Sequence, residues 1–266
     1  MTFDPNAAAA PDSGVFGLAT PKDRCLVRLI PVPFEATTSY GGGASRGPAG
    51  IFEASKQVDL FDIETGRPYE AGIWMDPPSK KILALNARAK NEAAKVIAAG
   101  GADGDPKLEK ARAAVDRASE DVDAFVYREA CAALDDDRVV GVVGGDHATP
   151  YGLIKAISER VPGVGVLHID AHADLREAYE GFTWSHASIM FNAVTRLPGL
   201  GRLVQVGVRD FCEEESDRIK RSKGRIKTHF DADLAARRHA GETWGAQCRR
   251  IVKDLPGEVY VSFDVD

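Results

Sequence analysis

The second half of the chain alternates between short apolar segments and segments with apolar residues at helical spacing. The apolar segments are nearly continuous, which is typical of strands buried on both faces in a parallel sheet between two layers of helices. We therefore predict a repeated strand-helix pattern from residue 138 onward. The predicted strands are 138–145, 163–170, 202–210, 225–231 and 258–266, and the predicted helices are 149–161, 213–222 and 232–255, the last interrupted near Gly241.

The first half of the chain has three different patterns. Residues 1–22 are small and rich in Ala and Pro without periodicity, which predicts a loose N-terminal arm. A strand at 25–34 and a glycine-rich loop at 37–47 follow, and the loop leads into a short helix with Pro48 near its start. Residues 79–135 are rich in Ala, Lys, Glu and Arg with apolar residues at helical spacing, which predicts a helical hairpin.

These elements predict one α/β domain over residues 23–266, with three αβα layers around a mainly parallel sheet. The helical hairpin, at about 79–135, is an expected insertion into that domain. Its apolar positions are expected to face the core or each other, and the alternative is a surface for a partner or for a second copy of the chain.

Composition and charge exclude several classes of function. Of the 266 residues 44% are hydrophobic, and the net charge is −6 with Lys and Arg scattered along the chain, which argues against a nucleic-acid partner. The four cysteines lie far apart, and the chain has neither a signal-peptide pattern nor an apolar run near the ~20 residues that cross a bilayer. We predict a cytoplasmic protein that does not enter a membrane.

Polar clusters follow three of the predicted strands. In the DxHxD segment at 170–174 the polar residues recur at every second position, so an extended chain would direct them to one side, and the DxD segment at 264–266 repeats that spacing. Because carboxyl ends of parallel strands meet at one edge of a sheet, the clusters are expected to converge. Their members are Asp146, His147, His168, Asp170, His172, Asp174, Asp264 and Asp266.

This combination of side chains predicts a metal centre. An Asp or His at one strand end is usually a cap or a loop residue, but four carboxylates brought together would repel one another unless cations lie between them. Two divalent ions would balance them, and a donor set of carboxylates with some imidazole suits Mn²⁺, with Zn²⁺, Ni²⁺ or Co²⁺ as alternatives. The predicted ligands are His147, Asp170, His172, Asp174, Asp264 and Asp266.

The three clusters resemble known signature segments. "GVVGGDHATPYG", "LHIDAHADLR" and "YVSFDVD" are similar to those of the ureohydrolase family, which includes arginase, agmatinase, guanidinobutyrase and formimidoylglutamase. The resemblance begins at "PVPFEATTSYGGGASRGPAGIFEAS" and reaches Asp266, and the helical hairpin fits it less well. The stretch "DLREAYEGFTWSHASIM" is most similar to agmatinase-type members.

The resemblance implies a site and a reaction. His186 matches the family histidine that delivers a proton to the departing amine, and Asp146 would lie beside the metals without binding them. Two Mn²⁺ ions would activate a water, which hydrolyses a small guanidino or amidino substrate to urea, or formamide, and an amine. One ion would be held by His147, Asp170, Asp174 and Asp264, and the other by Asp170, His172, Asp264 and Asp266, with Asp170 and Asp264 bridging.

Several alternatives remain open. An agmatinase-like enzyme of polyamine metabolism is the first hypothesis, with guanidinobutyrase, arginase and formimidoylglutamase as alternatives. A noncatalytic metal-binding or assembly protein is an alternative from another class, and a histone-deacetylase-like hydrolase would hold one zinc instead of two metals. The resemblance also implies a homo-oligomer, a trimer or a hexamer.

The position of "VYVSFDVD" leads to one more expectation. Family members continue past this strand with a further strand, helices and an acidic substrate-binding residue, whereas this sequence ends at Asp266. We therefore expect the sequence to be part of a longer protein, and a chain that truly ended here would bind metal weakly and have little activity.

Overall fold

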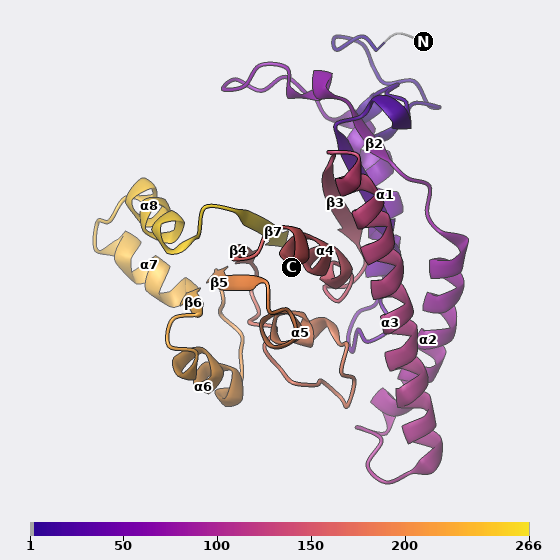
Figure 1. Ribbon diagram of the computed structural model, residues 1–266, viewed down its shortest axis with the longest axis vertical. Coiled ribbons are helices and arrows are strands. Elements are labelled where there is room, and N and C mark those ends of the chain that lie inside the picture. The colour runs from indigo at the N-terminus through magenta and orange to yellow at the C-terminus, as the bar shows by residue number, and fades with distance from the viewer. Residues whose placement is uncertain (1–2, 266) are drawn as a thin grey trace. The chain divides into compact units, whose positions relative to one another are not determined.

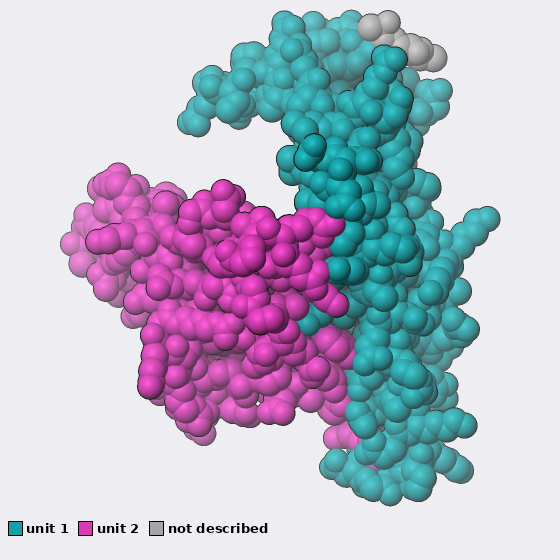
Figure 2. All heavy atoms as spheres, in the orientation of Figure 1, with its two compact units in different colours: residues 1–99, 103–153 teal, residues 100–102, 154–266 magenta. Residues whose placement is uncertain are grey.

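The computed structural model describes residues 3–265, which divide into two compact units (Figures 1 and 2). Unit 1 contains the described residues up to 99 together with 103–153, and unit 2 contains 100–102 and 154 onward. Each unit has one sheet, and all strands paired in these sheets are parallel, as predicted. Within residues 3–265, the structure contains no helix with the length and apolar character that a bilayer crossing requires.

The sheet of unit 1 has the strand order β2-β1-β3. Its central strand carries the almost fully buried residues Ile30 and Val32. The three-residue strand β2 has too few positions to show a period, and the sequence analysis does not identify it. The elements are β1 (Val27–Val32), β2 (Ile73–Met75), β3 (Val139–Gly144), α1 (Gly47–Ala54), α2 (Lys80–Ala98) and α3 (Pro106–Asp135).

The predicted helical hairpin is confirmed as α2 and α3, which run side by side in Figure 1. Helix α3 begins directly after Asp105, whose side chain accepts a hydrogen bond of 2.7 Å from the backbone N–H of Lys107, and Pro106 occupies the first turn. Val96 and Val115 are fully buried, as expected of the apolar positions, whereas the expectation is wrong for Leu83, which is 46% exposed.

A buried cation joins the hairpin to the sheet of unit 1. The Arg28 guanidinium on β1 is almost fully buried and donates to Asp76 Oδ2 at 2.7 Å through Nε. It also donates to Glu129 Oε2 on α3 at 2.9 Å. Both carboxylates raise the pKa of Arg28 against the effect of burial, so the guanidinium stays charged inside the unit.

The sheet of unit 2 has the order β6-β5-β4-β7. The predicted interruption near Gly241 is confirmed, because Gly241 adopts a φ of 92° and Thr243 caps the next helix. The sequence analysis does not identify α5. The elements are β4 (Val164–Ile169), β5 (Leu200–Val206), β6 (Ile226–His229), β7 (Val259–Phe263), α5 (Ile189–Arg196), α6 (Glu213–Arg221), α7 (Asp231–His239) and α8 (Trp244–Asp254), and α4 (Tyr151–Arg160) spans the change of unit.

Strand β7 differs from its prediction. It pairs with β4 as the parallel topology requires, but it is an edge strand of the four-stranded sheet. Val261 and Phe263 are 54% and 63% exposed, whereas Ser262 between them is buried. The expectation of a strand buried on both faces is therefore wrong for β7. Among residues 3–265, no helix or strand covers the face that carries Val261 and Phe263.

The glycine-rich loop after β1 is held by a buried carboxylate. Glu35 accepts hydrogen bonds from the backbone N–H groups of Gly43 at 2.5 Å and Ser45 at 3.0 Å, and its other oxygen pairs with the Lys90 ammonium on α2. The Asn86 side chain accepts the backbone N–H of Glu35 at 2.9 Å. Helix α2 and the loop thus share one anchor, and these donors lower the pKa of Glu35 to about 2 although burial opposes them.

We predict that Glu35→Gln lowers the free energy of unfolding at pH 7 by about 1–3 kcal/mol, because the variant loses a charged acceptor. The ordinary pKa of 4.5 falls to about 2 in the folded state, so this stabilisation is complete above pH 4.5 and is lost as the pH falls toward 2. Urea unfolding at pH 7 and pH 3.5 measures the difference in free energy of unfolding between the variant and the unmodified protein. The exposed Glu64→Gln is the control, and an equal deficit for Glu35→Gln at both pH values would contradict the prediction.

Candidate metal centre and active-site loop

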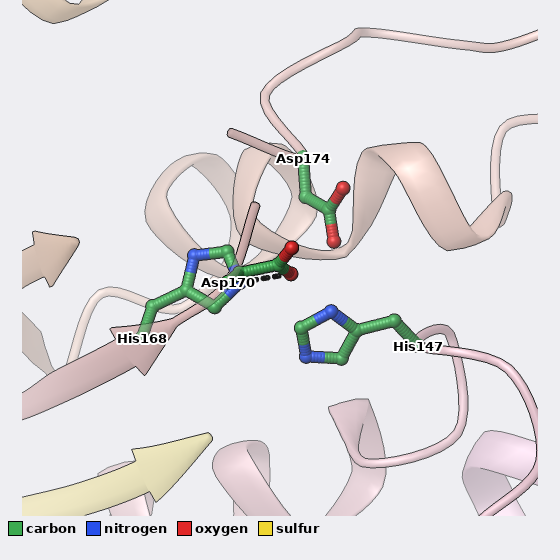
Figure 3. Close-up of side chains that lie close together, drawn as sticks. All are labelled: His147, His168, Asp170 and Asp174. Atoms are coloured by element: carbon green, nitrogen blue, oxygen red, sulfur yellow. Dashed lines mark hydrogen bonds and ion pairs between the residues drawn. The ribbon is translucent and has the colours of Figure 1, made fainter. Parts of the chain in front are cut away.

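The carboxyl end of β4 presents an imidazole and a carboxylate on one side of the sheet. His168 and Asp170 are two residues apart, so the period of the strand directs both side chains the same way, and both are buried (Figure 3). His168 Nε2 lies 2.7 Å from Asp170 Oδ2. The backbone N–H of His172 donates to the other oxygen, Asp170 Oδ1, at 2.7 Å. Both oxygens of this carboxylate are therefore fixed in direction.

A glutamine on the neighbouring strand sets the tautomer of His168. Gln205 Nε2 donates to the backbone carbonyl of Ala173 at 2.7 Å, and Gln205 Oε1 accepts from the Thr228 hydroxyl at 2.9 Å, which fixes the orientation of the amide. The same Nε2 lies 3.0 Å from His168 Nδ1, so Nδ1 accepts and carries no proton. Nε2–H then donates to Asp170, which makes His168 neutral and Asp170 ionised.

The DxHxD segment does not continue as a strand. Strand β4 ends at Ile169, and Asp174 adopts a left-handed φ of 53°. Asp174 is buried, and one carboxylate oxygen of Asp174 lies within 4.8 Å of ligand atoms of Asp170 and His168. The His172 side chain is 46% exposed, with Nδ1 3.4 Å from Asp170 Oδ1. The structure brings the two carboxylates together and leaves the ring of His172 nearer to solvent.

The register of β7 places Asp264 next to this segment. Phe263 pairs with Ile169, and the backbone N–H of Asp264 donates to the Ile169 carbonyl at 2.9 Å. Asp264 therefore follows β7 at the level where Asp170 follows β4. Asp266 lies outside the described residues.

In unit 1, His147 lies in a tight turn after β3. The backbone N–H of Asp146 donates to the Phe34 carbonyl at 2.8 Å, and a Cβ on Gly145 would lie 2.1 Å from that same oxygen. Gly145 has a φ of 23°, so glycine is required here for both space and backbone conformation. Asp146 Oδ1 accepts the backbone N–H of Ala148 at 3.1 Å, which closes the turn around His147.

A loop carries His186 back toward the DxHxD segment. The backbone N–H of Phe191 donates to the Asp174 carbonyl at 3.0 Å, and that of Arg176 donates to the Ala187 carbonyl at 3.2 Å. These bonds close both ends of the loop within unit 2. The Tyr179 ring meets the His186 ring edge-on, with 5.8 Å between ring centroids, so the imidazole packs against an aromatic wall.

The donor set of this site fits a divalent metal. Two buried carboxylates within 4.8 Å of each other repel unless a cation or a proton lies between them, and carboxylate oxygens with imidazole are donors that Mn²⁺ accepts. His168 also has its ring close to both carboxylates, but each of its nitrogens is already engaged by Asp170 or Gln205. His168 therefore orients the Asp170 carboxylate, which is a predicted ligand.

The sequence analysis missed the roles of His168 and Gln205. The available signal for His168 is its position two residues before Asp170 on the same strand. The signal for Gln205 is a polar residue within the apolar part of the predicted strand 202–210, since a buried amide needs a specific partner.

The comparison with protein families agrees with this geometry. The model of the arginase family matches residues 26–266, which is most of the chain. The chain belongs to the arginase family. The predicted family and its α/β fold with parallel sheets are thereby confirmed, and this arginase-family chain has ureohydrolases among its relatives.

Individual relatives support the assignment. The N(1)-aminopropylagmatine ureohydrolase of Thermus thermophilus is 29% identical over 249 residues, which are 93% of this chain and 69% of that protein. Its counterpart in Synechocystis is 31% identical over 73% of this chain and 54% of its own length. Among solved structures, the agmatine ureohydrolase of Thermoplasma volcanium has a TM-score of 0.66 over 96% of this chain and 70% of its own, at 19% identity, which shows the fold.

We predict that Asp170→Asn abolishes Mn²⁺ binding and that His168→Phe weakens it by about 10–100-fold, because the carboxylate loses the donor that orients it. Isothermal titration measures the Mn²⁺ affinity of both variants. His239→Phe, on the exposed end of α7, is the matched control, and circular dichroism checks that each variant is folded. Unchanged Mn²⁺ affinity in a folded His168→Phe variant would contradict the orienting role.

Proposed function

We propose that this arginase-family chain hydrolyses the guanidino C–N bond of a small aminoalkyl guanidine, as agmatinase-type enzymes do, and releases urea and an amine. The observation that carries the proposal is the buried pair Asp170 and Asp174, oriented by His168 and connected by a closed loop to His186. The relatives named as N(1)-aminopropylagmatine and agmatine ureohydrolases favour this substrate class over the arginase and formimidoylglutamase alternatives.

The proposed metal centre consists of carboxylates and imidazoles that follow predicted strands. When bound, two Mn²⁺ ions would supply positive charge and lower the pKa of water from ~15.7 toward neutrality. The buried carboxylates of the segment that follows β4 support the assignment, as does the position of Asp264 next to the end of β4. The proposed ligands are His147, Asp170, His172, Asp174, Asp264 and Asp266.

We also propose that residues 23–266 form one arginase-like domain, and that the protein is a cytoplasmic trimer or hexamer.

His186 has the chemistry to protonate the leaving amine. Collapse of the tetrahedral adduct would otherwise expel an amide anion, which is too basic to leave. An imidazole with an ordinary pKa of ~6.5 can hold and deliver this proton at neutral pH. The Ser185 hydroxyl lies 3.4 Å from His186 Nδ1, and the Tyr179 ring packs edge-on against the imidazole, so both neighbours support its orientation.

Release of urea tests the proposal. With Mn²⁺ added, we expect the protein to cleave agmatine or N(1)-aminopropylagmatine faster than arginine, 4-guanidinobutyrate or formiminoglutamate. His186→Ala should lower kcat by about 100-fold or more and leave Mn²⁺ binding intact, because the proton donor is lost and the ligands are kept. His239→Ala is the control. Protein that binds Mn²⁺ and cleaves no member of the panel would favour the noncatalytic alternative.

A further inference from the structure

A two-residue turn in the His186 loop has an unfavourable residue at its first central position. Tyr179 and Phe182 exchange both backbone hydrogen bonds, at 3.2 and 2.9 Å. Between them Glu180 has a φ of 52° and Gly181 a φ of 83°, the pattern of a type I′ turn. This turn favours Asn, Asp or Gly first, and a longer side chain such as Glu is strained there. A Glu at position 180 therefore makes the folded protein less stable than Asn, Asp or Gly would.

The carboxylate of Glu180 adds a second cost. Its Oε2 atom is buried, and this atom has no hydrogen-bond partner among the described residues. Burial raises the pKa of Glu180. A buried acceptor without a partner is rare because it loses its hydration for no return, and such groups often belong to binding or catalytic sites. A strained backbone and an unpartnered oxygen at the same residue indicate that a bound ligand supplies the missing donor to Glu180.

The turn is fixed beside the candidate proton donor. Phe182 is fully buried and anchors one side of the turn, and the Asn192 amide donates to the Thr183 carbonyl at 2.8 Å. On the other side, Tyr179 contacts the His186 ring. Glu180 is thus held by a rigid turn whose neighbouring side chain forms part of the wall around His186.

The chemistry of Glu180 selects the group that would complete it. A protonated amine supplies both a positive charge and the N–H donors that the buried oxygen of the half-buried Glu180 lacks, whereas a substrate carboxylate would be repelled. We propose that Glu180 binds the ammonium group at the far end of the guanidino substrate and so selects aminoalkyl guanidines over guanidino acids. This inference rests on the proposed function and names the specificity residue of the same site.

The Arg176 guanidinium provides the contrasting case. It lies 5.0 Å from the centre of the Tyr179 ring and is partly exposed on the same loop. If the substrate ended in a carboxylate, Arg176 would be its natural anchor and Glu180 would oppose binding. Substrates with different tails therefore distinguish the two residues.

The kinetic test compares three tails on one guanidino group, namely agmatine, butylguanidine and 4-guanidinobutyrate. We expect Glu180→Gln to raise the KM for agmatine by about 10–100-fold with little change in kcat, because only the distal ion pair is lost. Hydrolysis of butylguanidine should not change. Glu177→Gln, an exposed position on the same loop, is the matched control. An equal rise in KM for all three tails, or a defect confined to 4-guanidinobutyrate, would overturn the inference.

A binding measurement separates the inference from the proposed function. We expect 1,4-diaminobutane to bind the Mn²⁺-loaded protein in isothermal titration, and Glu180→Asn to weaken it by at least about tenfold. The same variant should keep or raise the Tm, since Asn suits the first position of the turn. Glu180-dependent diamine binding without urea release would support the inference and refute the proposed function. Urea release from agmatine with unchanged KM and diamine affinity in Glu180→Gln would do the reverse.

Discussion

The buried negative charge of Asp170 is the constraint on which the organisation of unit 2 depends. It is held by a line of hydrogen bonds that crosses three strands, from Thr228 on β6 through Gln205 on β5 to His168 on β4. Each member of this line has one orientation that satisfies its neighbours, so the strand order β6-β5-β4 also fixes the direction of the carboxylate. A carboxylate that is fixed in this way would need little reorganisation to bind a metal.

In unit 1, buried charged groups are satisfied by ion pairs. Arg28 is neutralised by Asp76 and Glu129, and Glu35 is satisfied by Lys90 and the glycine-rich loop. These pairs connect elements that the chain separates by more than 40 residues. Glu180 contrasts with them, because its buried oxygen has no such partner within residues 3–265. A buried acceptor of this kind at a strained turn is consistent with ligand binding.

The strands with the most continuous apolar residues were predictable, since a strand buried on both faces needs an apolar side chain at nearly every position. The polar clusters around His147 and Asp170 were predictable for the same reason, because each begins abruptly where such an apolar run ends. Strand β2 was not, since three residues show no period. The exposed ring of His172 was missed because the chain turns after Ile169, where extended geometry no longer applies.

By itself, the sequence determined the residue types of the site, their order along the chain and the family to which the chain belongs. Only the tertiary structure decided which nitrogen of His168 carries the proton, because that depends on Gln205, 37 residues away on the next strand. It also decided that one carboxylate oxygen of Glu180 is buried at a strained turn. Protonation and burial arise from the groups that folding brings around an atom, and a linear pattern contains no record of them.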